Sequence, residues 1–77
     1  MIGISKRKIR QYVKRVELER AGLVMAHARL ASGEEEGLVA CAIAMWLTVA
    51  HAWRDTAAHE TAERLVRQAR DERELPQ

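Results

Sequence analysis

A chain of 77 residues forms one domain that buries only about 60% of its unfolded surface, so it is marginally stable alone. Thirteen alanines, no phenylalanine and a single proline at position 76 favour an all-α fold, and a single cysteine excludes an intrachain disulfide. The formal net charge is only +2, but residues 1–33 are net +6 and residues 34–77 are net −4, which predicts attraction between the two halves.

The first predicted helix runs from about residue 6 to residue 31, with Ser5 as its N-cap. Its seam residues recur in alternating steps of four and three, the pattern of a helix packed against an antiparallel partner. Leu18 and Met25 lie on another side of this helix, either as tolerated surface residues or as a second contact face. The predicted seam consists of Ile9, Val13, Val16, Arg20, Leu23, His27 and Leu30.

The turn is predicted at residues 32–33. Ser32, followed three residues later by Glu35, has the sequence of a capping box. The triplet at residues 34–36 is then expected in the first turn of the next helix, where the positive end of the helix dipole favours carboxylates. A solvated helix start therefore explains the triplet, and binding of a metal or a basic partner is the alternative.

The second helix is predicted from about residue 34 to residue 73, because no Gly or Pro lies between residues 38 and 75. Such a helix would be about 60 Å long, against about 39 Å for the first helix, and would overhang it. The alternative is a break near residues 54–56, with Asp55 or Thr56 capping a third helix.

Residues 38–53 contain no charged side chain and are apolar all round, so nearly every side of this segment must be covered. A membrane span is not expected, because the run is short, rich in alanine, and contains Thr48 and His51. One strip of the second helix is dominated by alanine: Ala40, Ala44, Leu47, His51, Ala58, Ala62, Leu65 and Ala69. A bulkier strip holds Leu38, Val39, Ile43, Trp46, Val49, Ala50 and Trp53.

The first helix alone cannot cover both strips. We therefore expect one strip to pack inside the hairpin and the other to contact a second copy or a partner. Trp residues on such a strip would anchor the interface, since Trp is enriched at binding hot spots. The predicted interface residues are Leu38, Val39, Ile43, Trp46, Val49 and Trp53.

Basic residues crowd the start of the first helix, where six of them occur between residues 5 and 15 without an acidic residue. They are Lys6, Arg7, Lys8, Arg10, Lys14 and Arg15. A basic amphipathic helix of this kind can clamp the phosphates of a nucleic acid, lie on anionic lipid, or dock on an acidic protein. The alternative is a solvated face that balances the acidic second half.

The sequence carries only weak signals of a catalytic or metal-binding site. His51, Asp55, His59 and Glu63 recur at steps of four, but residue 63 is Glu where the HExxH metalloprotease motif requires its second His. His27 should lie opposite residues 38–41, and a Cys–His pair there would lack an orienting third group. No enzyme activity, metal or cofactor is therefore predicted. Cys41 is expected to be a buried, inert thiol in a reducing, cytoplasmic environment.

These patterns predict an all-α antiparallel hairpin that assembles into a helical bundle as a homodimer or higher oligomer. The predicted function is that of a small, non-enzymatic adaptor, inhibitor or regulator that docks on a larger macromolecule. The alternative is a nucleic-acid-binding regulator that uses the basic N-terminal helix, and a metal-binding bundle is a third hypothesis.

Overall fold

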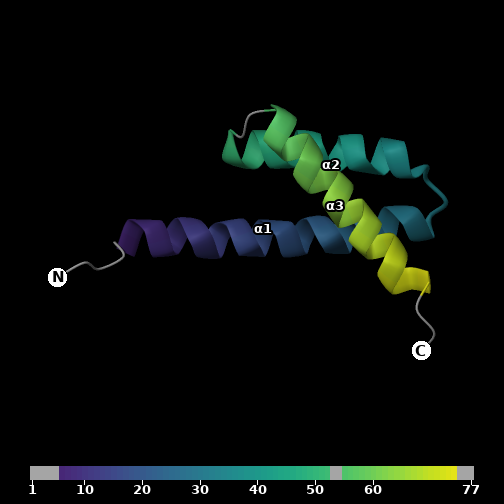
Figure 1. Cartoon of the computed structure of the whole chain (residues 1–77), viewed down its shortest axis with the longest axis horizontal. Helices are drawn as coiled ribbons and strands as arrows, with labels where there is room; N and C mark the ends of the chain where they lie inside the picture. The colour runs from purple at the N-terminus through teal and green to yellow at the C-terminus, as the bar shows by residue number, and fades with distance from the viewer. Residues whose placement is uncertain (1–5, 53–54, 75–77) are drawn as a thin grey trace.

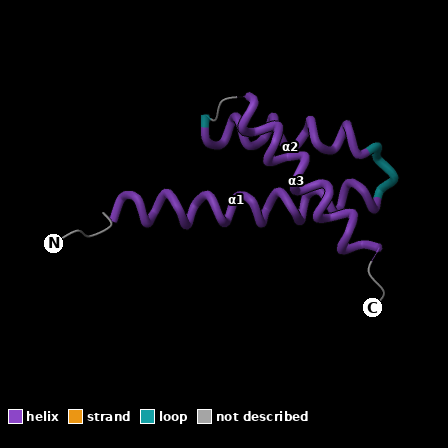
Figure 2. The backbone as a smooth tube through the Cα atoms, in the orientation of Figure 1, coloured by secondary structure: helices purple, strands orange, loops and turns teal. Residues whose placement is uncertain are grey.

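The computed structural model describes residues 6–52 and 55–74, except for the side chains of Lys8 and Ile9. These residues form three helices, α1 (Lys6–Ala31), α2 (Glu36–His51) and α3 (Asp55–Glu74), and contain no strand. Helices α1 and α2 run antiparallel, and α3 crosses both of them diagonally (Figure 1). Figure 2 shows the short connection between α1 and α2. The predicted all-α class and the bounds of the first helix are confirmed, and Ser5 lies outside the described residues.

The connection between α1 and α2 is a Schellman turn built around Gly33, whose φ is 85°. The amide of Glu34 donates to the carbonyl of Arg29 at 3.3 Å, and that of Gly33 donates to the carbonyl of Leu30 at 3.0 Å. The predicted capping box is wrong, because Ser32 donates its hydroxyl hydrogen back to the carbonyl of Ala28 instead. Glu35 becomes the N-cap of α2 without a side-chain hydrogen bond, and only Glu36 of the triplet lies in the first turn.

The prediction of one continuous second helix to about residue 73 is also wrong, because α2 ends at a residue in the left-handed conformation. Ala52 has φ 52° and ψ 39°, and α3 begins at Asp55 after this reversal. The alternative of a third helix is therefore the arrangement that forms. The return of α3 across the hairpin brings its own apolar side chains onto α1 and α2.

The core lies where the three helices meet. Gly22 of α1 lies close to both other helices: a Cβ at this position would lie 2.9 Å from Leu65 Cδ1 and 3.6 Å from Ile43 Cγ2 and from Trp46 Cζ3. The buried residues are Ala26 and Leu30 of α1, Val39, Ala40, Ile43 and Leu47 of α2, and Ala58, Thr61, Ala62, Leu65, Val66 and Ala69 of α3. Many of these residues are small, which allows the helix axes to approach closely.

Only the second half of α1 takes part in this core. Leu18 and Met25 are partly buried against it, so they form a contact face rather than isolated surface positions. Residues 6–17, which we call the α1 arm, project beyond α2 and α3 (Figure 1), and every described side chain of this arm is exposed. The predicted seam therefore fails at Val13 and Val16, because no neighbouring helix extends that far.

Polar bonds fasten α3 across the other two helices. Glu19 of α1 accepts from Arg64 at 3.0 Å, and His27 lies 2.9 Å from Glu72. Arg70 donates to Glu36 of α2 at 3.4 Å, and Arg73 donates to the carbonyl of Leu30 at 3.2 Å. Two of these bonds, Arg64–Glu19 and Arg70–Glu36, use cations of the acidic second half, whereas Lys6, Arg7, Arg10 and Lys14 of the α1 arm form no ion pair with a described residue.

Candidate interaction surfaces

The side of α2 that faces solvent is apolar. Ile43 and Trp46 face Gly22 of α1, and the opposite side carries four side chains at steps of three and four residues. This outer α2 face consists of Leu38, Cys41, Met45 and Val49. Leu38 is 62% exposed, Met45 70% and Val49 87%. Cys41 is exposed as well, so the prediction of a buried thiol is wrong.

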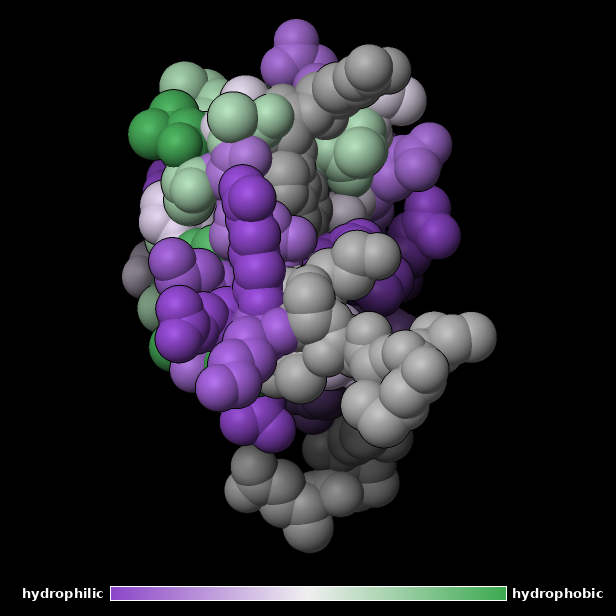
Figure 3. Space-filling view, turned by 90° about the vertical axis from the view of Figure 1, so that its left-hand side faces the viewer, coloured by the Kyte–Doolittle hydropathy of each residue, from purple (hydrophilic) through white to green (hydrophobic). Residues whose placement is uncertain are grey.

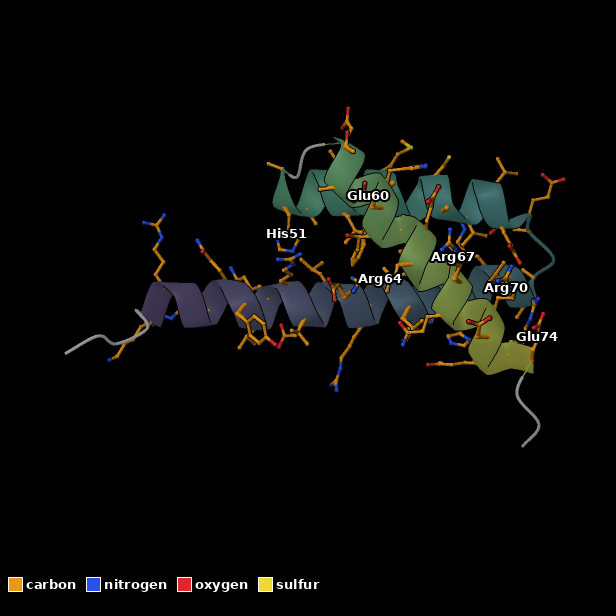
Figure 4. The ribbon with its side chains drawn as sticks, viewed as in Figure 1. His51, Glu60, Arg64, Arg67, Arg70 and Glu74 are labelled. Atoms are coloured by element: carbon orange, nitrogen blue, oxygen red, sulfur yellow. The ribbon has the colours of Figure 1, made fainter. Side chains whose placement is uncertain are left out.

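The outer α2 face continues into an open groove between α2 and the start of α3. The groove has a volume of about 750 Å³ and an apolar floor. Its rim is acidic, because Asp55 and Glu60 are exposed and neither forms an ion pair with any described residue. Figure 4 labels Glu60 near the start of α3, beside α2. The lining residues are Cys41, Ala44, Met45, Thr48 and Val49 of α2, and Asp55, Thr56, His59 and Glu60 of α3.

The predicted interface residues are divided by the structure. Val39 and Ile43 are fully buried inside the chain, and Trp46 is partly buried against the same core. Leu38 and Val49 are exposed on the outer α2 face, while Trp53 lies outside the described residues. Met45 was not among the predicted interface residues. It lies four residues from both Cys41 and Val49, and this spacing places all three side chains on the same face of a helix.

The α1 arm presents a second surface of opposite character. Lys6, Arg7, Arg10 and Lys14 are exposed, and none of them forms an ion pair with a described residue. A hollow of about 420 Å³ on this surface is lined by Arg7, Arg10, Gln11, Val13 and Lys14. Arg15 differs from the others, because it lies 3.8 Å from Glu19. The side chain of Lys8 is not among those described.

An apolar flank runs beside these cations. Tyr12 is 69% exposed, and Val13 and Val16 are 46% and 36% exposed. Viewed towards one end of the molecule, hydrophobic residues gather at the upper left, towards α2, and hydrophilic residues lie below them (Figure 3). The chain thus exposes one apolar groove with an acidic rim and one basic arm with an apolar flank.

The residues considered for catalysis and metal binding do not gather into one site in the described part of the chain. His27 is bonded to Glu72 of α3, whereas Cys41 lies on the exposed side of α2. His51 points from the end of α2 towards α1 (Figure 4), while His59 lies on α3 and contacts Glu63 at 3.0 Å. Among the described residues, no group of three His, Cys, Asp or Glu side chains could hold a metal ion.

The strongest electrostatic coupling lies in the turn between α1 and α2. Arg29 donates two hydrogen bonds to the carboxylate of Glu34, at 2.6 and 3.0 Å. This bidentate bond lowers the pKa of Glu34 and raises the pKa of Arg29, because it favours the charged form of both groups. The pair thereby fastens the turn that sets α1 antiparallel to α2.

Comparison with protein-family models, with curated proteins and with solved structures found no match. Within the described ranges, none of the helices combines the length and the apolar character needed to cross a membrane. Of the charge-free run at residues 38–53, residues 38–51 belong to α2, which ends at His51.

Proposed function

We propose that this chain is a small, non-enzymatic interaction protein, an adaptor, inhibitor or regulator, that self-associates and docks on a larger macromolecule. The observation that carries the proposal is the outer α2 face. It is a row of large apolar side chains left in solvent after the chain has folded and buried its own core. Contiguous apolar surfaces of this kind on small soluble domains mark contact sites.

The energetics support burial of this face in an assembly. Covering an exposed Leu, Met or Val side chain contributes about 1.5–3 kcal/mol, so Leu38, Met45 and Val49 together supply several kcal/mol. A chain of 77 residues gains much from such support because its own core is small. Two hairpins joined along this face would form a helical bundle.

The test is the mass in solution, measured by light scattering over a range of concentrations. We expect a homodimer or a larger oligomer, and we expect Val49→Glu to lower the mass while its helical circular dichroism is retained. Val24→Glu is the matched control, because Val24 is 68% exposed on α1. A monomeric wild-type chain, or a Val49→Glu chain with unchanged mass, would contradict the proposal.

A second candidate function is nucleic-acid binding through the α1 arm. It is favoured by the hollow lined by Arg7, Arg10 and Lys14, which concentrates positive charge that no described acid neutralises. Backbone phosphates would occupy such a surface, and the affinity would fall steeply with salt. A chain carrying Arg10→Glu and Lys14→Glu should lose nucleic-acid binding. The control is Arg67→Glu, a charge reversal at an exposed residue of α3, which should retain most of the binding. Binding that is insensitive to salt would exclude this function.

A further inference from the structure

We propose that the α1 arm of one copy lies in the groove between α2 and α3 of a second copy, so that two reciprocal contacts hold a dimer. This inference rests on the self-association proposed above and names the surfaces that meet. A single kind of contact would then cover both the exposed α1 arm and the exposed groove. A reciprocal exchange about a two-fold axis closes the assembly, whereas a one-way contact would continue into a chain of molecules.

The first argument is the apolar match. The arm exposes Tyr12, Val13 and Val16 at helical spacing, which is the pattern of anchors by which a helix binds a hydrophobic groove. The groove offers Met45 and Val49 as an exposed apolar floor. Both sets remain in solvent in the single chain, so their mutual burial removes apolar area from water on both sides.

The second argument is the charge match. Arg10 and Lys14 stand beside the apolar flank of the arm, and Asp55 and Glu60 stand on the rim of the groove. All four side chains are exposed, and none forms an ion pair with a described residue of its own chain. Opposite charges facing each other across an interface set its register and exclude wrong partners.

The third argument is that a chain cannot fill its own groove. Helix α1 packs on the side of α2 that carries Ile43 and Trp46. The groove opens on the other side, where Cys41, Met45 and Thr48 lie. The arm is also of suitable length, since 12 helical residues span about 18 Å and the groove follows α2 over about 12 Å. The arm that occupies the groove must therefore come from another molecule.

The test exchanges the charges. One variant carries Arg10→Glu and Lys14→Glu, and the other carries Glu60→Lys and Asp55→Asn, in which Asn still suits a helix start. Each variant alone opposes like charges and should have monomer mass. An equimolar mixture should regain dimer mass, because the altered arm then meets the altered groove and the native arm meets the native groove. Circular dichroism of each variant checks that its helices are retained.

A chemical cross-link provides the second measurement. Cys41 lines the groove and is the chain's single cysteine. A Val13→Cys chain treated with a short bis-maleimide should therefore form covalent dimers through the arm and the partner's groove. Val24→Cys, at a position that is more exposed than Val13 but lies beyond the arm, should form far fewer.

The outcomes separate this inference from the proposed function. If both charge variants keep dimer mass while Val49→Glu is monomeric, self-association through α2 stands and the arm-in-groove contact is refuted. If the wild-type chain is monomeric, both fail. If the arm variant keeps dimer mass but loses nucleic-acid binding, the arm serves nucleic acid and the inference is again overturned.

Discussion

Gly22 lies where all three helices meet, and replacing it gives a sharp test of that crossing. In Gly22→Ala the new Cβ would lie 2.9 Å from Leu65 Cδ1, which is closer than side-chain carbons approach each other. Alanine improves helix propensity by about 0.8–1.0 kcal/mol, but overpacking a filled core costs about 1–3 kcal/mol. Gly22→Ala should therefore lower the free energy of unfolding by about 0–2 kcal/mol, although alanine is the better helix former.

Leu65→Val removes the δ-carbons that oppose the new methyl group. The remaining neighbours, Ile43 and Trp46, lie 3.6 Å from the added Cβ, which is ordinary contact. In this background Gly22→Ala should raise the free energy of unfolding by about 1 kcal/mol from propensity alone. The two substitutions should thus be coupled by about 1–3 kcal/mol in a double-mutant cycle.

The assay is urea unfolding followed by far-ultraviolet circular dichroism, with all four chains at one concentration because self-association would add to apparent stability. The reasoning is refuted if Gly22→Ala stabilises the wild-type chain by the full propensity gain and the cycle shows no coupling. That result would mean that α3 does not pass over α1 at Gly22.

Three further predictions use the same unfolding measurement. Leu47→Ala should cost about 2–5 kcal/mol, since Leu47 is fully buried, and a cost below 1 kcal/mol would place it outside the core. Ala52→Gly should stabilise the chain by about 1 kcal/mol, because glycine adopts the left-handed conformation without the penalty of a Cβ; a destabilised variant would argue against this reversal. Arg29 lowers the pKa of Glu34, so the contribution of their bond is complete above the carboxylate's unfolded pKa and is lost as pH falls through its lower folded pKa. Glu34→Gln should accordingly lose less stability on acidification than the wild type, and equal losses would show that the bond does not contribute.

The sequence predicted α1 and its end because the signals there are local. Gly33 supplies the left-handed residue that a helix terminus favours, and it lies at the predicted turn. The end of α2 has no such signal, since an alanine takes the left-handed conformation at a cost of about 1–2 kcal/mol. Burial of Ala58, Ala62 and Leu65 after the reversal offsets that cost. This stabilisation comes from contacts between residues that are distant in the sequence, so the residues around position 52 do not predict it.

The exposed apolar surface of α2 was only partly predictable for the same reason. With two helices, one strip of the charge-free run would have been left for another copy. The third helix takes part in that cover: α1 packs on the side of Ile43 and Trp46, α3 packs against α2 as well, and Ala40 and Leu47 are buried within the chain. Because the run is apolar all round, a third side still remains in solvent, and it carries Met45. An apolar surface therefore remains exposed, and it keeps Leu38 and Val49 of the predicted residues and adds Cys41 and Met45.

The position of α3 after α1 and α2 in the chain has a consequence for biosynthesis. Leu65 meets α1 at Gly22, and Arg70 and Glu72 fasten α3 to the other two helices. A nascent chain that ends before residue 55 lacks Ala58, Ala62 and Leu65, which belong to the core of the complete fold. Because synthesis proceeds from α1 to α3, the core cannot close until α3 is made. During that interval the unfinished hairpin exposes surface that favours aggregation, so slow translation of residues 55–74 would prolong its most vulnerable state.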